Sequence, residues 1–86
     1  MTINEIIREI MRNNNISLST MGNALRKSDK ITPLSSRDIA ARLKNDNMTF
    51  DKAVEMLNVL GYKIVIFNDE TGESFTADQR KKIKLL

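Results

Sequence analysis

The sequence predicts a mainly α-helical fold of about four short helices, followed by a C-terminal β-strand or hairpin. Three observations lead to this fold class. Apolar residues recur every three or four positions in four stretches before residue 61, which is the periodicity of helices with one buried face. Residues that cap helices stand before these stretches. After Gly61 the chain changes to the β-branched and aromatic run Tyr62–Phe67, which favours a strand.

The first helix is predicted from a capping box, in which Thr2 is followed three residues later by Glu5. An apolar stripe follows at helical spacing, and it consists of Ile3, Ile6, Ile7, Ile10 and Met11. Three asparagines at 13–15 then end the helix, because Asn tolerates left-handed and turn conformations.

The second helix begins near Ser17 or Ser19, since either can serve as its N-cap. Its inner face consists of Leu18, Met21, Gly22 and Leu25. Glycine inside a helix costs about 1 kcal/mol relative to alanine. Gly22 therefore predicts that another backbone passes close by, and the alternative is a slightly weak helix without such a neighbour.

The third helix follows the polar linker 26–33, which ends with the only proline of the chain. Ser35 as N-cap and Asp38 three residues later form a variant of the capping box, and Leu34 with Ile39 forms a hydrophobic staple. Both features are local, so they fix the residue at which the helix begins.

Ile39 and Leu43 form the face of this third helix that is expected to point inward. At 100° per residue the opposite face is formed by Arg37, Ala41 and Lys44. Asp38 and Arg42 are spaced as an i,i+4 pair on the flank.

The fourth helix is capped by Thr49 and ended by Gly61. Its expected buried stripe consists of Phe50, Ala53, Val54, Leu57 and Leu60. In the strand that follows, Tyr62, Ile64 and Ile66 form one apolar face, and Val65 and Phe67 form the other. A turn at 68–73 and the segment 73–76 then predict a return strand.

The composition argues against an enzyme. The chain has 86 residues, no Cys and no His, so it lacks the commonest general base and metal ligand and any thiolate nucleophile. We expect one domain with no cofactor, no metal ion and no small-molecule ligand. The first ten residues carry charges and no apolar run, so we expect no signal peptide there, and no segment reaches the roughly 20 apolar residues of a membrane span. These features predict a cytoplasmic protein.

The charges are unevenly distributed along the chain. From Arg26 to Lys44 there are six cations and two acids, whereas 45–79 holds two cations and seven acids. The tail 80–86 adds four cations and no acid. This order predicts a polarised surface. The alternative is that solvated helices simply carry charges, and the charge distribution alone does not favour either interpretation.

The order of motifs resembles the Cro and phage-repressor (XRE-like) family of helix-turn-helix proteins. ISLSTMGNALR (16–26) is similar to the first helix of that unit, and SSRDIAARLKNDN (35–47) resembles its recognition helix. NMTFDKAVEMLNVLGYKIVI (47–66) is similar to the segment that follows in small members. Met21 and Gly22 replace the usual Leu and Ala, and the linker 26–33 is several residues longer than the usual turn.

The resemblance implies sequence-specific binding to double-stranded DNA, with the third helix in the major groove. The candidates for contacts with bases are Ser36, Arg37, Ala40, Ala41 and Lys44. The candidates for contacts with phosphates are Ser19, Thr20, Lys27, Lys30, Ser35 and Asn45. Among these, Arg37 is the best reader of a base, because a guanidinium can bond a guanine edge through two hydrogen bonds.

The resemblance also implies a homodimer that represses transcription at a pseudo-palindromic operator. Its interface would be formed by Tyr62, Ile64, Val65, Ile66 and Phe67, since an exposed strand with two apolar faces needs a partner. The expected organisation is a helix-turn-helix bundle at 1–61, with the helix-turn-helix at about 18–45. A dimerisation hairpin at 62–76 and a basic tail at 77–86 complete the chain.

A second interpretation is a protein-binding module, such as an anti-defence inhibitor of a phage or an antitoxin, built on the same fold. Its working surface would be the long linker together with the acidic residues Asp46, Asp51, Glu55, Asp69, Glu70 and Glu73. The two interpretations differ in their response to salt, because DNA binding weakens steeply as salt rises.

Overall fold

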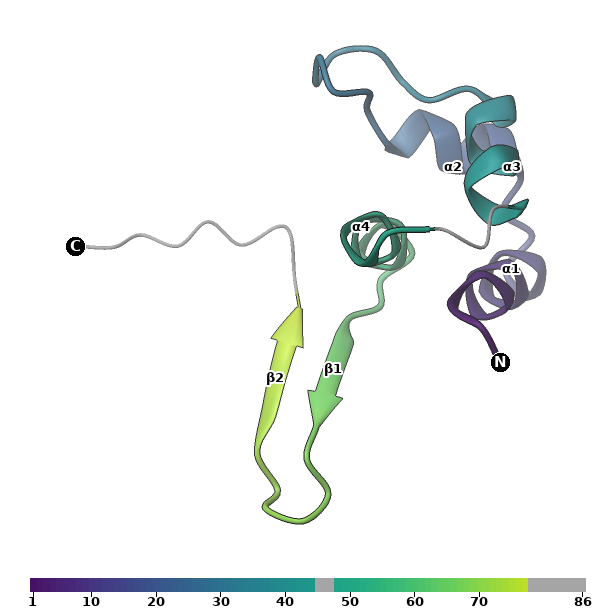
Figure 1. The fold of residues 1–86 in the computed structure, drawn as a ribbon. Coiled ribbons are helices and arrows are strands. Elements are labelled where there is room, and N and C mark those ends of the chain that lie inside the picture. Colours follow the sequence, from purple (N-terminus) through teal and green to yellow (C-terminus); the bar gives the residue numbers. More distant parts are fainter. Residues whose placement is uncertain (45–47, 78–86) are drawn as a thin grey trace.

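The computed structural model describes residues 1–44 and 48–77, and it consists of four helices followed by an antiparallel hairpin (Figure 1). The helices are α1 (Ile3–Asn13), α2 (Leu18–Ala24), α3 (Ser36–Lys44) and α4 (Phe50–Val59). The strands are β1 (Ile64–Phe67) and β2 (Ser74–Ala77). The prediction of a small, mainly helical protein with a C-terminal hairpin is confirmed. No helix within the described ranges has the length and apolar character needed to cross a membrane.

The helices begin at the predicted capping residues. The Thr2 hydroxyl accepts a hydrogen bond from the Glu5 N–H at 3.1 Å, and the Thr2 N–H donates to the Glu5 carboxylate at 2.7 Å. Ser17 and Thr49 cap α2 and α4 by accepting from the backbone N–H three residues later. Of the two candidate caps for α2, the structure uses Ser17. These bonds satisfy N–H groups that have no partner within the helix.

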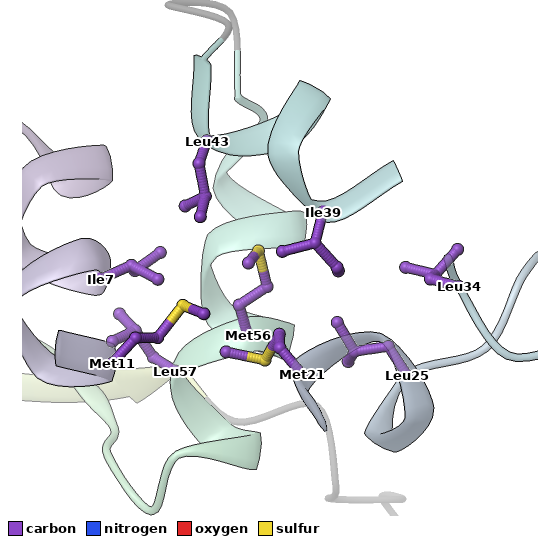
Figure 2. Packing of buried hydrophobic residues seen from close by; sticks show 9 residues of the cluster. All are labelled: Ile7, Met11, Met21, Leu25, Leu34, Ile39, Leu43, Met56 and Leu57. Atoms are coloured by element: carbon purple, nitrogen blue, oxygen red, sulfur yellow. The ribbon is translucent and has the colours of Figure 1, made fainter. Parts of the chain in front are cut away.

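A cluster of nine buried apolar side chains fills the space between the four helices (Figure 2). Its members are Ile7, Met11, Met21, Leu25, Leu34, Ile39, Leu43, Met56 and Leu57. Three of them are methionines, whose flexible side chains fill irregular gaps between short helices. Leu34 and Ile39, the two members of the predicted staple, both belong to this core.

Three residues of the expected apolar faces are exposed instead. Phe50 is 52% exposed, Leu18 is 37% exposed and Ile6 is 36% exposed. Met56, which the sequence reasoning passed over, is fully buried. Phe50 and Leu18 occupy the first position of their helix. Phe50 borders an apolar hollow beside Ile3 and Ile64, at the edge of the bundle. Helical periodicity assigned these residues to the inner face, but it does not show where the core ends along the helix.

Gly22 lies directly against the backbone that leads into α3. A Cβ atom at this position would stand 2.3 Å from the Leu34 carbonyl oxygen, and the Leu34 N–H donates to the Gly22 carbonyl at 3.0 Å. The predicted close backbone approach is therefore confirmed. It holds the start of α3 against α2.

The hairpin begins two residues later than expected, because the backbone N–H groups of Gly61 and Tyr62 are hydrogen-bonded to carbonyls of α4. Gly61 has a φ of +92°, and its N–H donates to the Asn58 carbonyl at 3.0 Å. The Tyr62 N–H donates to the Leu57 carbonyl at 2.8 Å, which completes a Schellman motif. Because Tyr62 closes the helix, the ladder of β1 starts at Ile64.

The two strands place their side chains on two unequal faces. Ile64 stands opposite Ala77 and Ile66 opposite Phe75, so one face is entirely apolar. On the other face Val65 and Phe67 stand opposite Thr76 and Ser74. The hairpin extends away from the helices (Figure 1), and Ile66 and Phe75 are 57% and 62% exposed. Residues 78–86 of the predicted basic tail lie outside the described residues.

Candidate nucleic-acid interface

Helix α3 is held by its inner side, where Ile39 and Leu43 are buried in the core (Figure 2). The side away from the core carries Arg37, Ala41 and Lys44, and all three are exposed. The two predicted faces of this helix are therefore confirmed. The outer face offers two cations on either side of a small residue.

The start of α3 is fixed by reciprocal hydrogen bonds between Ser35 and Asp38. The Ser35 N–H donates to the Asp38 carboxylate at 3.0 Å, and the Asp38 N–H donates to the Ser35 hydroxyl at 3.1 Å. Hydrogen bonding to Ser35 lowers the pKa of the Asp38 carboxyl, and the charges of Lys27 and Arg42 lower it further. The predicted capping box is thus present, and it places Ser36 and Arg37 at the first two helical positions.

The candidates for base contacts are gathered on this one helix. Ser36, Arg37, Ala41 and Lys44 are exposed, whereas Ala40 is half-buried at the border of the outer face. Ala40 is therefore the least accessible of the five.

The candidates for phosphate contacts come from three segments. Ser19 and Thr20 are exposed on the first turn of α2, and Ser35 is exposed at the start of α3. Lys27 and Lys30 are exposed in the loop between these helices. Asn45 lies outside the described residues.

The long loop 26–33 is closed by hydrogen bonds along its length. A β-bridge joins Arg26 and Pro33 at its base, and the Lys27 N–H donates to the Thr32 carbonyl at 2.8 Å. The Asp29 carboxylate accepts from the Thr32 hydroxyl at 2.6 Å and from the N–H groups of Thr32 and Ile31 at 2.9 and 2.8 Å. These bonds, those of Thr32 first, lower the pKa of Asp29 to about 2. The loop is therefore held by its own hydrogen bonds and is not an irregular linker.

Two polar contacts attach α3 to its neighbours. Arg42 forms its direct ion pair with Glu55 of α4, half-buried at 3.0 Å, whereas its interaction with Asp38 is the effect of its charge on the pKa of that carboxyl. Asp38 is occupied by the Ser35 N–H, and α4 brings a second carboxylate within reach. The Asn4 side chain of α1 donates to the Leu43 carbonyl at 3.1 Å, which binds one of the last carbonyls of α3.

The structure also gathers cations that the sequence reasoning did not connect. Arg26, Arg42 and Lys52 line a single groove together with Lys27 and Lys30 of the loop. We call it the loop groove; it lies between loop 26–33, α3 and α4. Arg26 and Arg42 belong to the basic stretch of the sequence, but Lys52 lies in the acidic stretch, and only the fold brings it to this place.

Comparison of the chain with protein-family models, with curated proteins and with solved structures found no match. The resemblance to Cro-like proteins therefore stays a prediction from sequence. The interpretation of the site depends on the geometry described above.

Proposed function

We propose that this chain binds double-stranded DNA in a sequence-specific manner and acts as a small homodimeric repressor of transcription. The observation that carries the proposal is the outer face of α3. Arg37, Ala41 and Lys44 are exposed there on a helix whose other side is buried in the core. A cationic helix face with short side chains between the charges suits entry into the major groove.

In this proposal the outer face of α3 meets the base edges, beginning with its first turn. Arg37 bonds a guanine through two parallel hydrogen bonds, and Ala41 lies against a thymine methyl group. Lys44 contacts DNA one turn of helix farther on. The capping bonds between Ser35 and Asp38 support this role, because they fix which residues enter the groove first.

The proposed homodimer is supported by the apolar face of the hairpin. Ile66 and Phe75 share this face and are both more than half exposed. A two-stranded hairpin is marginally stable alone, and the same face of a second copy is self-complementary. Two copies would then present two α3 helices to successive major grooves, about 34 Å apart.

The acidic residues of the second interpretation lie in two places. Asp51 and Glu55 belong to α4, and Glu55 is paired with Arg42. Asp69, Glu70 and Glu73 belong to the turn at the far end of the hairpin (Figure 1), and Asp46 lies outside the described residues. This separation favours the DNA-binding proposal over a single acidic docking surface.

The decisive measurement is binding to a generic DNA duplex at two salt concentrations. We expect affinity to fall steeply as salt rises, because each neutralised phosphate releases counterions. Absence of binding at low salt would contradict the proposal and favour the protein-binding module. Selection of bound sequences from random duplexes would then give the half-site and its spacing.

Arg37→Ala tests which residue reads the bases. We expect this change to reduce the preference for the selected sequence by roughly 10-fold or more, in line with about 1–3 kcal/mol for a bidentate contact. Arg37→Lys is the matched control: it retains the charge but not the two parallel donors, so it should keep binding to generic DNA while losing preference. An equal loss on all sequences would make Arg37 a phosphate contact.

A further inference from the structure

The loop groove is an open channel of about 620 Å³ on the flank of α3. Of the described residues, those that line it are Arg26, Lys27, Ser28, Lys30, Arg42, Asp51, Lys52 and Glu55. Five of these are cations and two are acids. One of the acids, Glu55, is already paired with Arg42 at 3.0 Å. The groove therefore retains a clear excess of positive charge.

The loop side of the groove is shaped before any ligand arrives. Asp29 accepts three hydrogen bonds from Ile31 and Thr32, and the bridge between Arg26 and Pro33 closes the base of the loop. The Arg26 guanidinium donates to the carbonyls of Asn23 and Leu25 at 2.6 and 2.8 Å. A binding wall that is already ordered loses less conformational entropy when a ligand binds.

The opposite wall is fixed as well. The ion pair between Arg42 and Glu55 joins α3 to α4, and Lys52 lies on the first turn of α4. Lys27 is close enough to the start of α3 for its charge to act on Asp38. The α3 residue that lines the groove is Arg42, and its charge acts on Asp38 as well. The groove consequently lies along the flank of α3 that carries Asp38 and Arg42.

We propose that the loop groove holds the sugar-phosphate backbone of one DNA strand while α3 occupies the adjacent major groove. This inference depends on the proposed DNA binding and assigns the phosphate contacts to a particular channel. The ligand class is a phosphodiester chain, which lysines and arginines bind without reading the sequence. The extra length of loop 26–33 thereby has a role in phosphate binding, since the loop forms one wall of the groove. An acidic protein segment is the competing ligand.

The test uses the full chain and a generic fluorescent duplex, with affinity measured over a range of salt concentrations. Lys27→Ala, Lys30→Ala and Lys52→Ala each remove one cation from the groove. Each is expected to reduce the slope of log affinity against log salt by about 0.9, with equal losses on all sequences. Lys63→Ala is the matched control, because Lys63 is exposed between α4 and β1 and does not line the groove; its slope should stay that of the original chain.

A change of opposite sign provides a second readout. Asp51→Asn removes an acid from the groove and is expected to tighten DNA binding about two- to five-fold at low salt. Asp69→Asn makes the same chemical change in the hairpin turn and should leave affinity unchanged. Circular dichroism of every variant checks that the helices are retained.

The outcomes separate this inference from the proposed function. If the original chain binds DNA and the groove variants keep its salt slope, the channel is not the phosphate site, although DNA binding stands. If the original chain does not bind DNA at low salt, both proposals are wrong. Binding of poly-glutamate that depends on Lys27 and Lys52, without binding of DNA, would assign the groove to an acidic protein partner and overturn the inference.

Discussion

Gly22 sets the distance between α2 and the backbone that leads into α3. The space for a side chain is taken by the Leu34 carbonyl oxygen, 2.3 Å from where a Cβ would stand. That oxygen is a main-chain atom, and its residue, Leu34, directly precedes Ser35, the N-cap of α3. A side chain at position 22 would therefore displace the start of the proposed recognition helix.

Gly22→Ala is expected to destabilise the protein even though alanine is the better helix former. Overpacking costs about 1–3 kcal/mol, and a contact of 2.3 Å with a main-chain oxygen belongs to the upper part of this range, above the roughly 1 kcal/mol gained in helix propensity. Thermal unfolding should show a net loss of stability, at roughly 4–8 °C in Tm per kcal/mol for a domain of this size. Asn23→Ala, on the exposed side of the same helix, is the control and should be neutral or slightly stabilising. A Gly22→Ala variant that melts higher than the original chain would contradict the contact.

Among the elements, those governed by local rules were predictable. The caps at Thr2, Ser35 and Thr49 and the reversal at Gly61 depend on residues within a few positions of each other, and all are present. The outer face of α3 followed from helical periodicity alone. Each of these features can therefore be predicted from the sequence before any tertiary contact is known.

Features that depend on contacts between elements were not predictable. The partner of Arg42 proved to be Glu55, 13 residues away on another helix, because capping occupied the nearer carboxylate of Asp38. The exposure of Phe50 and the grouping of Lys52 with the loop cations also depend on how the helices are arranged. Periodicity gives the direction of a side chain around its helix, but it does not give the neighbours that the helix meets.

Loop 26–33 is an element in its own right, and its order depends on the ionised form of Asp29. The carboxyl has a pKa of about 2 in the folded loop, below its usual value of 3.8. Because the folded pKa is depressed, the contribution of Asp29 to stability is present above the usual pKa and is lost as the pH falls through about 2. At neutral pH the loop should therefore be fully closed.

This expectation can be checked by NMR, by following the amide signals of Ile31 and Thr32 as the pH is lowered. Both should shift with a midpoint near 2, since both N–H groups donate to the Asp29 carboxylate. In Asp29→Asn this transition should be absent, and the two amides should exchange faster with solvent at neutral pH. A midpoint near 3.8 would show that the carboxylate does not close the loop in solution.

At the scale of the molecule, the described residues form a helical core and a hairpin whose outer apolar side chains, Ile66 and Phe75, are exposed. Ile64 packs against the core, and the same face of the hairpin continues outward through Ile66 and Phe75. Phe50 and Ile3 border the apolar hollow at the base of this face. The apolar surface thus runs from the bundle onto the hairpin, at a place where a second copy of the chain would bury it.

Ile66→Ser combined with Phe75→Ser should convert the proposed dimer into a monomer. The original chain is expected to sediment as a dimer at micromolar concentration, and the double variant as a monomer with its helices intact, because neither residue belongs to the buried core. Val65→Ser with Phe67→Ser, on the mixed face, is the matched control and should weaken association less.

The loss of the dimer has a consequence for DNA binding that no loss of a single contact would have. Each monomer would still carry one α3 and should bind a half-site, but the gain in affinity from linking two half-sites would disappear. The double variant should therefore lose its preference for a two-half-site duplex over a single half-site, and its response to Lys52→Ala should be unchanged. A monomeric original chain, or a double variant that still prefers paired half-sites, would exclude the hairpin as the dimer interface.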